Sequence, residues 1–173
     1  MAARRNPDPP LTLMFADDGA IPNNPSLPLV IYRGAFDLAR DPEATIERRF
    51  ARNGWGDSWR DGIFPYVHYH AAIHEALGVA RGQARVRFGG HAGEEVELAA
   101  GDVAILPAGT GHHGLWVSPD FVLIGAYPKS GRYDLCRGST SEYARAIHTI
   151  PQTPRPDADP VHGKDGPLLT LWR

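Results

Sequence analysis

Residues 62–82 read Gly-Ile-Phe-Pro-Tyr-Val-His-Tyr-His-Ala-Ala-Ile-His-Glu-Ala-Leu-Gly-Val-Ala-Arg-Gly, with a glycine at each end. His68 and His70 are two residues apart, so on a strand both side chains point to the same face. Glu75 has the wrong parity to share that face on an unbroken strand. We therefore expect the chain to turn within residues 71–74, so that Glu75 begins the neighbouring strand. Two imidazoles and a carboxylate can then be directed at one point.

A second stretch, residues 101–112, reads Gly-Asp-Val-Ala-Ile-Leu-Pro-Ala-Gly-Thr-Gly-His and adds His112 after a rigid turn. Three imidazoles and one carboxylate suit a divalent transition metal such as Fe, Mn, Ni or Zn. On a six-coordinate ion this set leaves two positions open, as a catalytic site requires. For any one of these histidines, a scattered surface position is a fair alternative. For the whole set that alternative is poor, because the spacing, the residue types and the turn residues all fit a shared metal site.

Both stretches resemble the conserved motifs of the cupin superfamily. The first matches G-x5-H-x-H-x4-E-x6-G at every fixed position, and the second matches G-x5-P-x-G-x2-H up to His112. The second motif often continues to an asparagine, where this chain has Trp116. The resemblance, which extends to single-domain bacterial cupins, implies an all-β double-stranded β-helix, or jelly roll, with short flanking helices. It also implies that His68, His70, Glu75 and His112 are the metal ligands.

The rest of the chain fits many short strands joined by turns, because it holds 19 glycines and 16 prolines in 173 residues. We predict one domain over residues 1–173, with an N-terminal arm (1–26), a barrel core (27–135) and a C-terminal helix and irregular tail (139–173). Alternating or continuously apolar residues predict strands at 11–15, 29–32, 84–88, 95–98, 102–106, 121–126 and 168–172. Helices are predicted at about 41–53, with Asp41 as N-cap, and at 140–149, with Tyr143, Ala146 and Ile147 on one face.

The charge of the chain argues against nucleic acids and anionic membranes as partners. The formal net charge is −2 and the pI is about 6.4, whereas nucleic-acid and anionic-membrane surfaces need clustered Lys and Arg. The runs Arg4-Arg5 and Arg48-Arg49 are too short for that role. Cys136 is the single cysteine, so an intramolecular disulfide is ruled out. With no secretory signal or membrane span recognised, we expect a cytoplasmic protein in which Cys136 is a small buried residue rather than a nucleophile.

Several residues beside the predicted ligands could be mistaken for ligands themselves. His74 and His113 each adjoin a ligand and would point to the opposite face, so His74 is predicted to act in a turn or as support for the ligands. Tyr66 and Tyr69 are either cavity wall or core. Asp134 and Asp165 are predicted to be loop and turn residues despite their carboxylates.

The ligand set favours a small-molecule metalloenzyme, either dioxygenase-like or isomerase-like, with a mononuclear site of three histidines and one glutamate. The alternative is a non-catalytic cupin that binds or senses a small ligand. The sequence singles out no catalytic residue beyond the ligands, and it does not identify the substrate. We also expect a homodimer, because the apolar strands 11–15 and 29–32 lie outside the motif-bearing barrel and need a cover.

Overall fold

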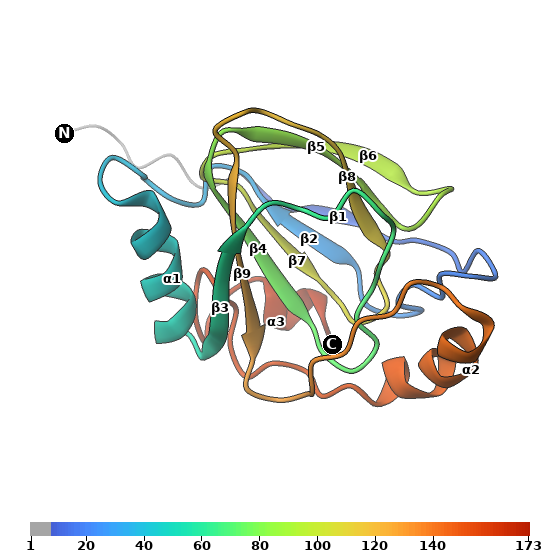
Figure 1. Ribbon diagram of the computed structural model, residues 1–173. Coiled ribbons are helices and arrows are strands. Elements are labelled where there is room, and N and C mark those ends of the chain that lie inside the picture. Colours follow the sequence, from blue (N-terminus) through green and yellow to red (C-terminus); the bar gives the residue numbers. More distant parts are fainter. Residues whose placement is uncertain (1–7) are drawn as a thin grey trace.

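The computed structural model describes residues 8–173, so the first seven residues of the predicted N-terminal arm, with Arg4 and Arg5, lie outside the described part (Figure 1). The elements in chain order are β1 (Leu11–Leu13), β2 (Leu29–Tyr32), α1 (Pro42–Arg52), β3 (Trp55–Asp61), β4 (Glu75–Arg81), β5 (Gln83–Phe88), β6 (Glu94–Ala99), β7 (Val103–Leu106), β8 (His112–Val117), β9 (Val122–Pro128), α2 (Thr140–Thr149), a 3-10 turn (Ile150–Gln152) and α3 (Leu168–Leu171). Among these described helices, none is long and apolar enough to cross a bilayer.

Two antiparallel sheets face each other in a jelly roll, as the resemblance to the cupin motifs implies. The larger sheet has the order β1-β2-β7-β4-β9-β3, and the smaller has the order β6-β5-β8. In Figure 1 the smaller sheet lies above the larger one, and α1 flanks the β3 edge. Strands far apart in the sequence thus become neighbours, because β4 pairs with both β7 and β9.

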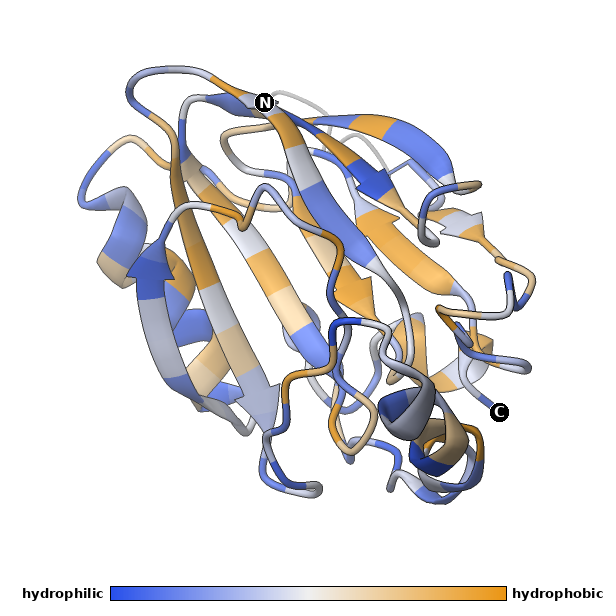
Figure 2. Cartoon of the chain, turned by 45° about the vertical axis from the view of Figure 1, so that its right-hand side comes forward, coloured by the Kyte–Doolittle hydropathy of each residue, from blue (hydrophilic) through white to orange (hydrophobic). Residues whose placement is uncertain are grey.

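The inner strands of the larger sheet are buried on both faces, which explains why β2 and β7 are apolar at every position. Alternate residues of β2, Leu29 and Ile31, join the core between the two sheets, while Val30 and Tyr32 join a second core on the outer face. Figure 2 shows the resulting hydrophobic strands inside the molecule and the more polar residues towards its surface. A continuous apolar run is the pattern of a strand covered on both sides.

Helix α1 covers part of the outer face and matches its prediction closely. The Asp41 carboxylate accepts a hydrogen bond from the Ala44 amide at 3.4 Å, and Ile46 and Phe50 are fully buried. Gly78 of β4 makes the close approach achievable, because a Cβ there would lie only 2.7 Å from the Ile46 side chain. A larger residue at Gly78 would push the helix away from the sheet.

The predicted last strand at 168–172 is wrong, because this segment forms the short helix α3. Leu168 and Trp172 are four residues apart and both are buried against the outer face of the larger sheet. The Trp172 indole also donates a hydrogen bond to the Pro28 carbonyl at 2.8 Å. A short apolar segment has no intrinsic preference that decides between strand and helix. Here the segment packs on the outer face of the larger sheet and pairs with none of its strands.

Helix α2 is confirmed, with one difference in its buried face. Ser139 and Glu142 form a capping box at its start. Ala146 is buried as predicted, but Ile147 is 40% exposed. The next buried residue is Ile150, which keeps the four-residue spacing from Ala146.

Candidate metal centre

The four predicted ligand side chains meet inside the barrel. One nitrogen from each of His68, His70 and His112 lies within 4.8 Å of the others. The Glu75 Oε2 atom lies 3.3 Å from His70 Nε2 and 3.4 Å from His112 Nε2. All four residues are buried, with exposed fractions of 2–6%. We call His68, His70, Glu75 and His112 the histidine–glutamate cluster.

Strand geometry brings Glu75 into the cluster. The chain bends at residues 71–72, and β4 begins at Glu75, as the parity argument predicts. Along β4, Glu75, Leu77 and Val79 alternate with residues that face the outer core, so the carboxylate points between the sheets.

The two motif segments are joined directly by backbone hydrogen bonds. The His68 amide donates to the His112 carbonyl, and the His112 amide donates back at 2.9 Å. The Gly109 amide, in the turn before His112, donates to the His70 carbonyl at 2.7 Å. Gly109 has a φ of +96°, and a Cβ there would meet the Asn23 carbonyl at 2.6 Å. The Pro-Ala-Gly turn is therefore a backbone requirement for placing His112.

Each histidine of the cluster has its Nδ1 atom against a backbone carbonyl. His68 Nδ1 lies 3.1 Å from the Tyr66 oxygen, His112 Nδ1 lies 3.0 Å from the Thr110 oxygen, and His70 Nδ1 contacts the Asp134 oxygen. A carbonyl only accepts hydrogen bonds, so Nδ1 carries the proton in all three rings. In the neutral imidazoles the Nε2 lone pairs are then free, and they face the cluster. This arrangement orients metal-ligating histidines in proteins generally.

The electrostatics of the cluster match a cation site. Glu75 Oε2 is buried without a hydrogen-bond partner among the described residues. Burial alone would raise the pKa of Glu75, but the adjacent His70 and His112 hold it well below its ordinary value, so the carboxylate is charged. Burial, reinforced by the His112 charge, lowers the pKa of His68 to about 3. A buried anion beside histidine nitrogens, which can each lose a proton on metal binding, fits a divalent ion.

The cluster lies in the wall of a large cavity of about 870 Å³. The other wall residues come mainly from β3, β9 and the segments 62–64 and 129–133, and they include Trp59, Phe64, Leu77, Leu123, Tyr127 and Tyr133. Tyr127 is 8% exposed. Burial and the Glu75 carboxylate raise its pKa far above the ordinary value, so its hydroxyl keeps its proton. The cavity therefore combines a polar end with large aromatic and aliphatic walls, as small-molecule sites do.

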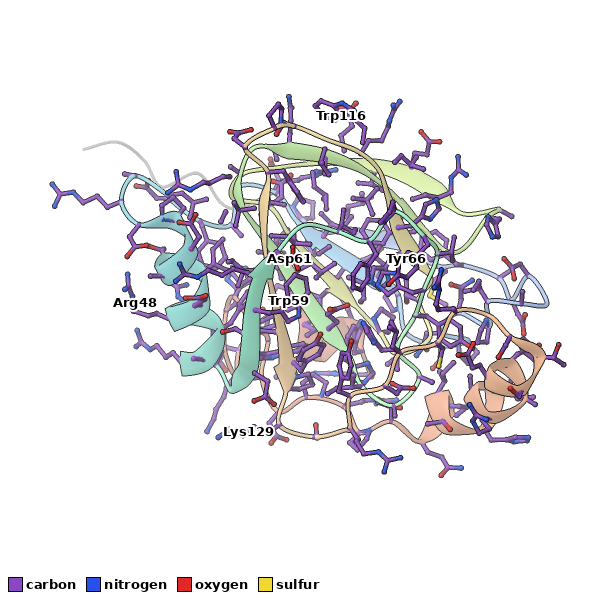
Figure 3. The ribbon with its side chains drawn as sticks, in the orientation of Figure 1. Arg48, Trp59, Asp61, Tyr66, Trp116 and Lys129 are labelled. Atoms are coloured by element: carbon purple, nitrogen blue, oxygen red, sulfur yellow. The ribbon has the colours of Figure 1, made fainter. Side chains whose placement is uncertain are left out.

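The residues beside the ligands have separate roles. His74 points away from the cluster, where its Nδ1 accepts a hydrogen bond from the Ala108 amide at 2.9 Å. It thereby supports the turn that precedes His112, in line with its predicted supporting role. His113 pairs with Arg87 on the opposite face of β8. Tyr69 is a fully buried core residue. Tyr66, labelled in Figure 3, stacks on Phe64 beneath the Arg137 guanidinium.

Cys136 and Asp134 lie in the loop that supports His70. Burial raises the pKa of the Cys136 thiol to about 12, which agrees with a packing role rather than a nucleophilic one. The Asp134 carboxylate accepts hydrogen bonds at 3.0 Å from the amides of both Ala71 and Ala72. Asp134 is a loop residue as predicted, and its carboxylate fixes the bend between His70 and Glu75.

Two buried asparagines were not found by sequence reasoning. Asn23 accepts from the Gly111 amide at 3.1 Å, and Asn24 donates to the Ala108 carbonyl at 2.9 Å. Both hold the turn that leads to His112. The only signal is the Pro-Asn-Asn-Pro run of residues 22–25, which indicates a turn but not its tertiary contacts.

Comparisons with known proteins add one relative of clear similarity. No family model matches the chain. The protein YjlB of Bacillus subtilis (strain 168), described as uncharacterized, is 42% identical over 161 residues, which cover 93% of this chain and 95% of YjlB.

Similar solved structures include the QdtA 3,4-ketoisomerase of Thermoanaerobacterium thermosaccharolyticum, with 16% identity, a TM-score of 0.43, and coverage of 57% of this chain and 74% of that chain. The acireductone dioxygenase of Bacillus anthracis has 20% identity, a TM-score of 0.38, and coverage of 51% and 60%. A double-stranded β-helix protein of Klebsiella pneumoniae has 15% identity, a TM-score of 0.39, and coverage of 79% and 90%. At these identities and TM-scores, nothing about the chemistry of these proteins is carried over to this chain.

Proposed function

Since this chain belongs to the family of Bacillus subtilis YjlB, and its two motifs and jelly roll resemble those of the cupin superfamily, we propose that it is a mononuclear metalloenzyme acting on a small molecule. His68, His70, Glu75 and His112 would hold one divalent ion of Fe, Mn, Ni or Zn. The observation that carries the proposal is the convergence of three buried histidine nitrogens, two of which lie 3.3 and 3.4 Å from the Glu75 Oε2 atom. Such an ion supplies Lewis-acid or O₂-binding chemistry when bound.

The protein's own residues would bind and shield the substrate. The cavity of about 870 Å³ is large enough for a drug-sized molecule. Its apolar walls would exclude water from the polar end, which strengthens the electrostatic interactions there. Tyr127, with its proton retained, supplies a hydrogen-bond donor beside the carboxylate. The reaction that we propose is either dioxygenase-like or isomerase-like. We also propose that the protein acts in the cytoplasm.

The metal site is tested by a matched pair of histidine variants. His112→Ala should remove most of the bound metal, because it deletes an inward-facing ligand. His113→Ala should retain close to one ion per chain, because the neighbouring side chain lies on the opposite face of β8. Metal content is measured by plasma mass spectrometry on protein refilled with each metal in turn. Equal loss in the two variants would contradict the proposed ligand set.

The reaction class is tested by adding metals to the metal-free protein. An O₂-using enzyme should consume O₂ with Fe(II) or Mn(II) only, whereas a Lewis-acid isomerase should work nearly as well with Zn(II) or Ni(II). A pool of small molecules is followed by mass spectrometry. Tight ligand binding without turnover for any metal would favour the alternative of a binding or sensor protein.

A further inference from the structure

The hydroxyl of Tyr127 has a direction that its hydrogen bonding fixes. The Trp59 indole nitrogen donates to the Tyr127 oxygen at 2.9 Å. An indole N–H is only a donor, so the tyrosine oxygen is the acceptor in this bond. The tyrosine's own proton must therefore point away from the indole. Both side chains line the cavity. The Glu75 carboxylate is close enough to accept the Tyr127 proton and so raises the pKa of this hydroxyl, and a ligand oxygen held beside Glu75 would compete for the same proton.

The position of Trp59 depends on a glycine in the neighbouring strand. Trp59 of β3 is paired with Gly125 of β9, and Tyr127 follows two residues later on the same face. A Cβ at Gly125 would lie 2.0 Å from the indole ring, so only glycine lets the ring lie across β9. Figure 3 shows Trp59 in the middle of the molecule, where β3 runs beside β9. Gly125 thus makes room for the Trp59 indole, and the indole orients the Tyr127 hydroxyl within the cavity.

We propose that Tyr127, oriented by Trp59, donates a hydrogen bond to an anionic oxygen of the small molecule that binds beside Glu75. This inference rests on the proposed function and narrows its substrate class to molecules that present a carboxylate, enolate or similar oxygen anion to the metal. A cation and a fixed O–H donor directed at the same space both select an anionic oxygen. The aromatic and aliphatic walls of the cavity would contact the rest of the molecule.

The test uses the full-length protein loaded with Co(II) and titrated with acetohydroxamic acid, whose anion binds metals through oxygen. Binding is followed by the visible absorption of Co(II). Tyr127→Phe should weaken acetohydroxamate binding by about tenfold or more, the usual effect of losing a hydrogen bond to a charged group. The affinity for Co(II) itself should change by less than the tenfold loss typical of a lost outer-shell partner.

Three further variants keep the result interpretable. Trp59→Phe and Gly125→Ala should each weaken acetohydroxamate binding by a smaller factor, because they free the hydroxyl to rotate without removing it. If Tyr127→Phe does not fold, these two variants test the inference instead, and unchanged acetohydroxamate affinity in both would contradict it. Tyr143→Phe removes a tyrosine hydroxyl that bonds to Asp17 on the surface, and it should bind acetohydroxamate as the unmodified protein does.

Unchanged acetohydroxamate affinity in Tyr127→Phe would overturn the inference. Parallel loss of Co(II) and acetohydroxamate affinity would also overturn it, because Tyr127 would then act only by positioning Glu75. If the unmodified protein gives no Co(II) spectrum, the proposed function fails as well. The two failures are distinguishable, since the Co(II) spectrum is recorded before any acetohydroxamate is added.

Discussion

His70 differs from His68 in the charge that it carries without a metal. Burial lowers the pKa of His70, but the Glu75 carboxylate raises it by more, to about 8. For His68, burial and the neighbouring His112 outweigh the smaller opposing effect of Glu75, so its pKa is lowered to about 3 and it stays neutral. At neutral pH the metal-free cluster therefore contains a protonated His70 beside a charged Glu75. A metal ion must displace that proton before Nε2 of His70 can bind it.

This difference predicts the number of protons that metal binding releases. At pH 7, below the His70 pKa of about 8, Zn²⁺ should release about one proton, and at pH 9 almost none. The affinity should accordingly rise as the pH approaches 8 and then level off, whereas His68 contributes no proton in this range. Calorimetric titration in buffers with different ionisation enthalpies measures the release. If the same number of protons were released at pH 7 and at pH 9, the metal would not be displacing a proton from His70.

The Asp134 loop is the element whose support of the cluster is most readily tested. Asp134→Ala removes the acceptor for two amides in the bend between His70 and Glu75. We expect metal affinity to fall about tenfold, as for other partners that orient ligands, with competition against a chelating dye as the measurement. Asp120→Ala is the control, because that exposed carboxylate accepts only from the Ser118 hydroxyl among the described contacts. Equal affinity in the two variants would contradict a positioning role for Asp134.

At the same scale, sequence patterns predicted the strand that begins at Glu75, but not strand β8, which carries His112, or strand β3, which lines the cavity. His68, His70 and Glu75 could be placed because strand parity and a turn are local properties. Strand β3 has the sequence Trp-Gly-Asp-Ser-Trp-Arg-Asp, which lacks the apolar alternation of a strand. Its register shifts between Gly56 and Trp59, and it is held by pairing with β9. Trp59 was missed for that reason.

The contacts around His112 could not be predicted for a different reason. Asn23 and Asn24 reach residues 88 and 84 positions away in the sequence. A turn-forming run such as Pro-Asn-Asn-Pro shows that the chain bends, but it does not show which distant amide the side chain meets. The wrong strand at 168–172 has a similar origin, because the sheet that α3 covers is built from distant segments.

For the whole molecule, Asp159 is the residue that fastens the C-terminal tail to the barrel. It is fully buried, and its carboxylate accepts hydrogen bonds from the Tyr32 hydroxyl and from the amides of Val161, His162 and Leu168. Asp159→Ala leaves these donors without a partner, so the free energy of unfolding should fall by about 3 kcal/mol. Urea denaturation measures this loss. Asp165→Ala, at an exposed position of the same tail, should change stability little, and a similar loss there would contradict the assigned role.

The oligomeric state is the second prediction for the whole molecule. Strand β1 forms one edge of the larger sheet, and its Leu11 is 40% exposed. Open edges of this kind are usually covered, so we propose a homodimer in which a second copy covers β1. Sedimentation at micromolar concentration should show a dimer, and Leu11→Lys should shift it towards monomer. A monomer at that concentration without the substitution would end this proposal.

The most direct test of the metal centre is anomalous diffraction from crystals grown with one equivalent of Zn²⁺ or Co²⁺. The signal locates the ion without assuming which residues bind it. We predict one strong peak per chain, at about 2.0–2.2 Å from Nε2 of His68, His70 and His112 and from a Glu75 carboxylate oxygen. A peak at any other position, or no peak between these four side chains at full metal loading, would contradict the account of this protein as a mononuclear metal-binding cupin.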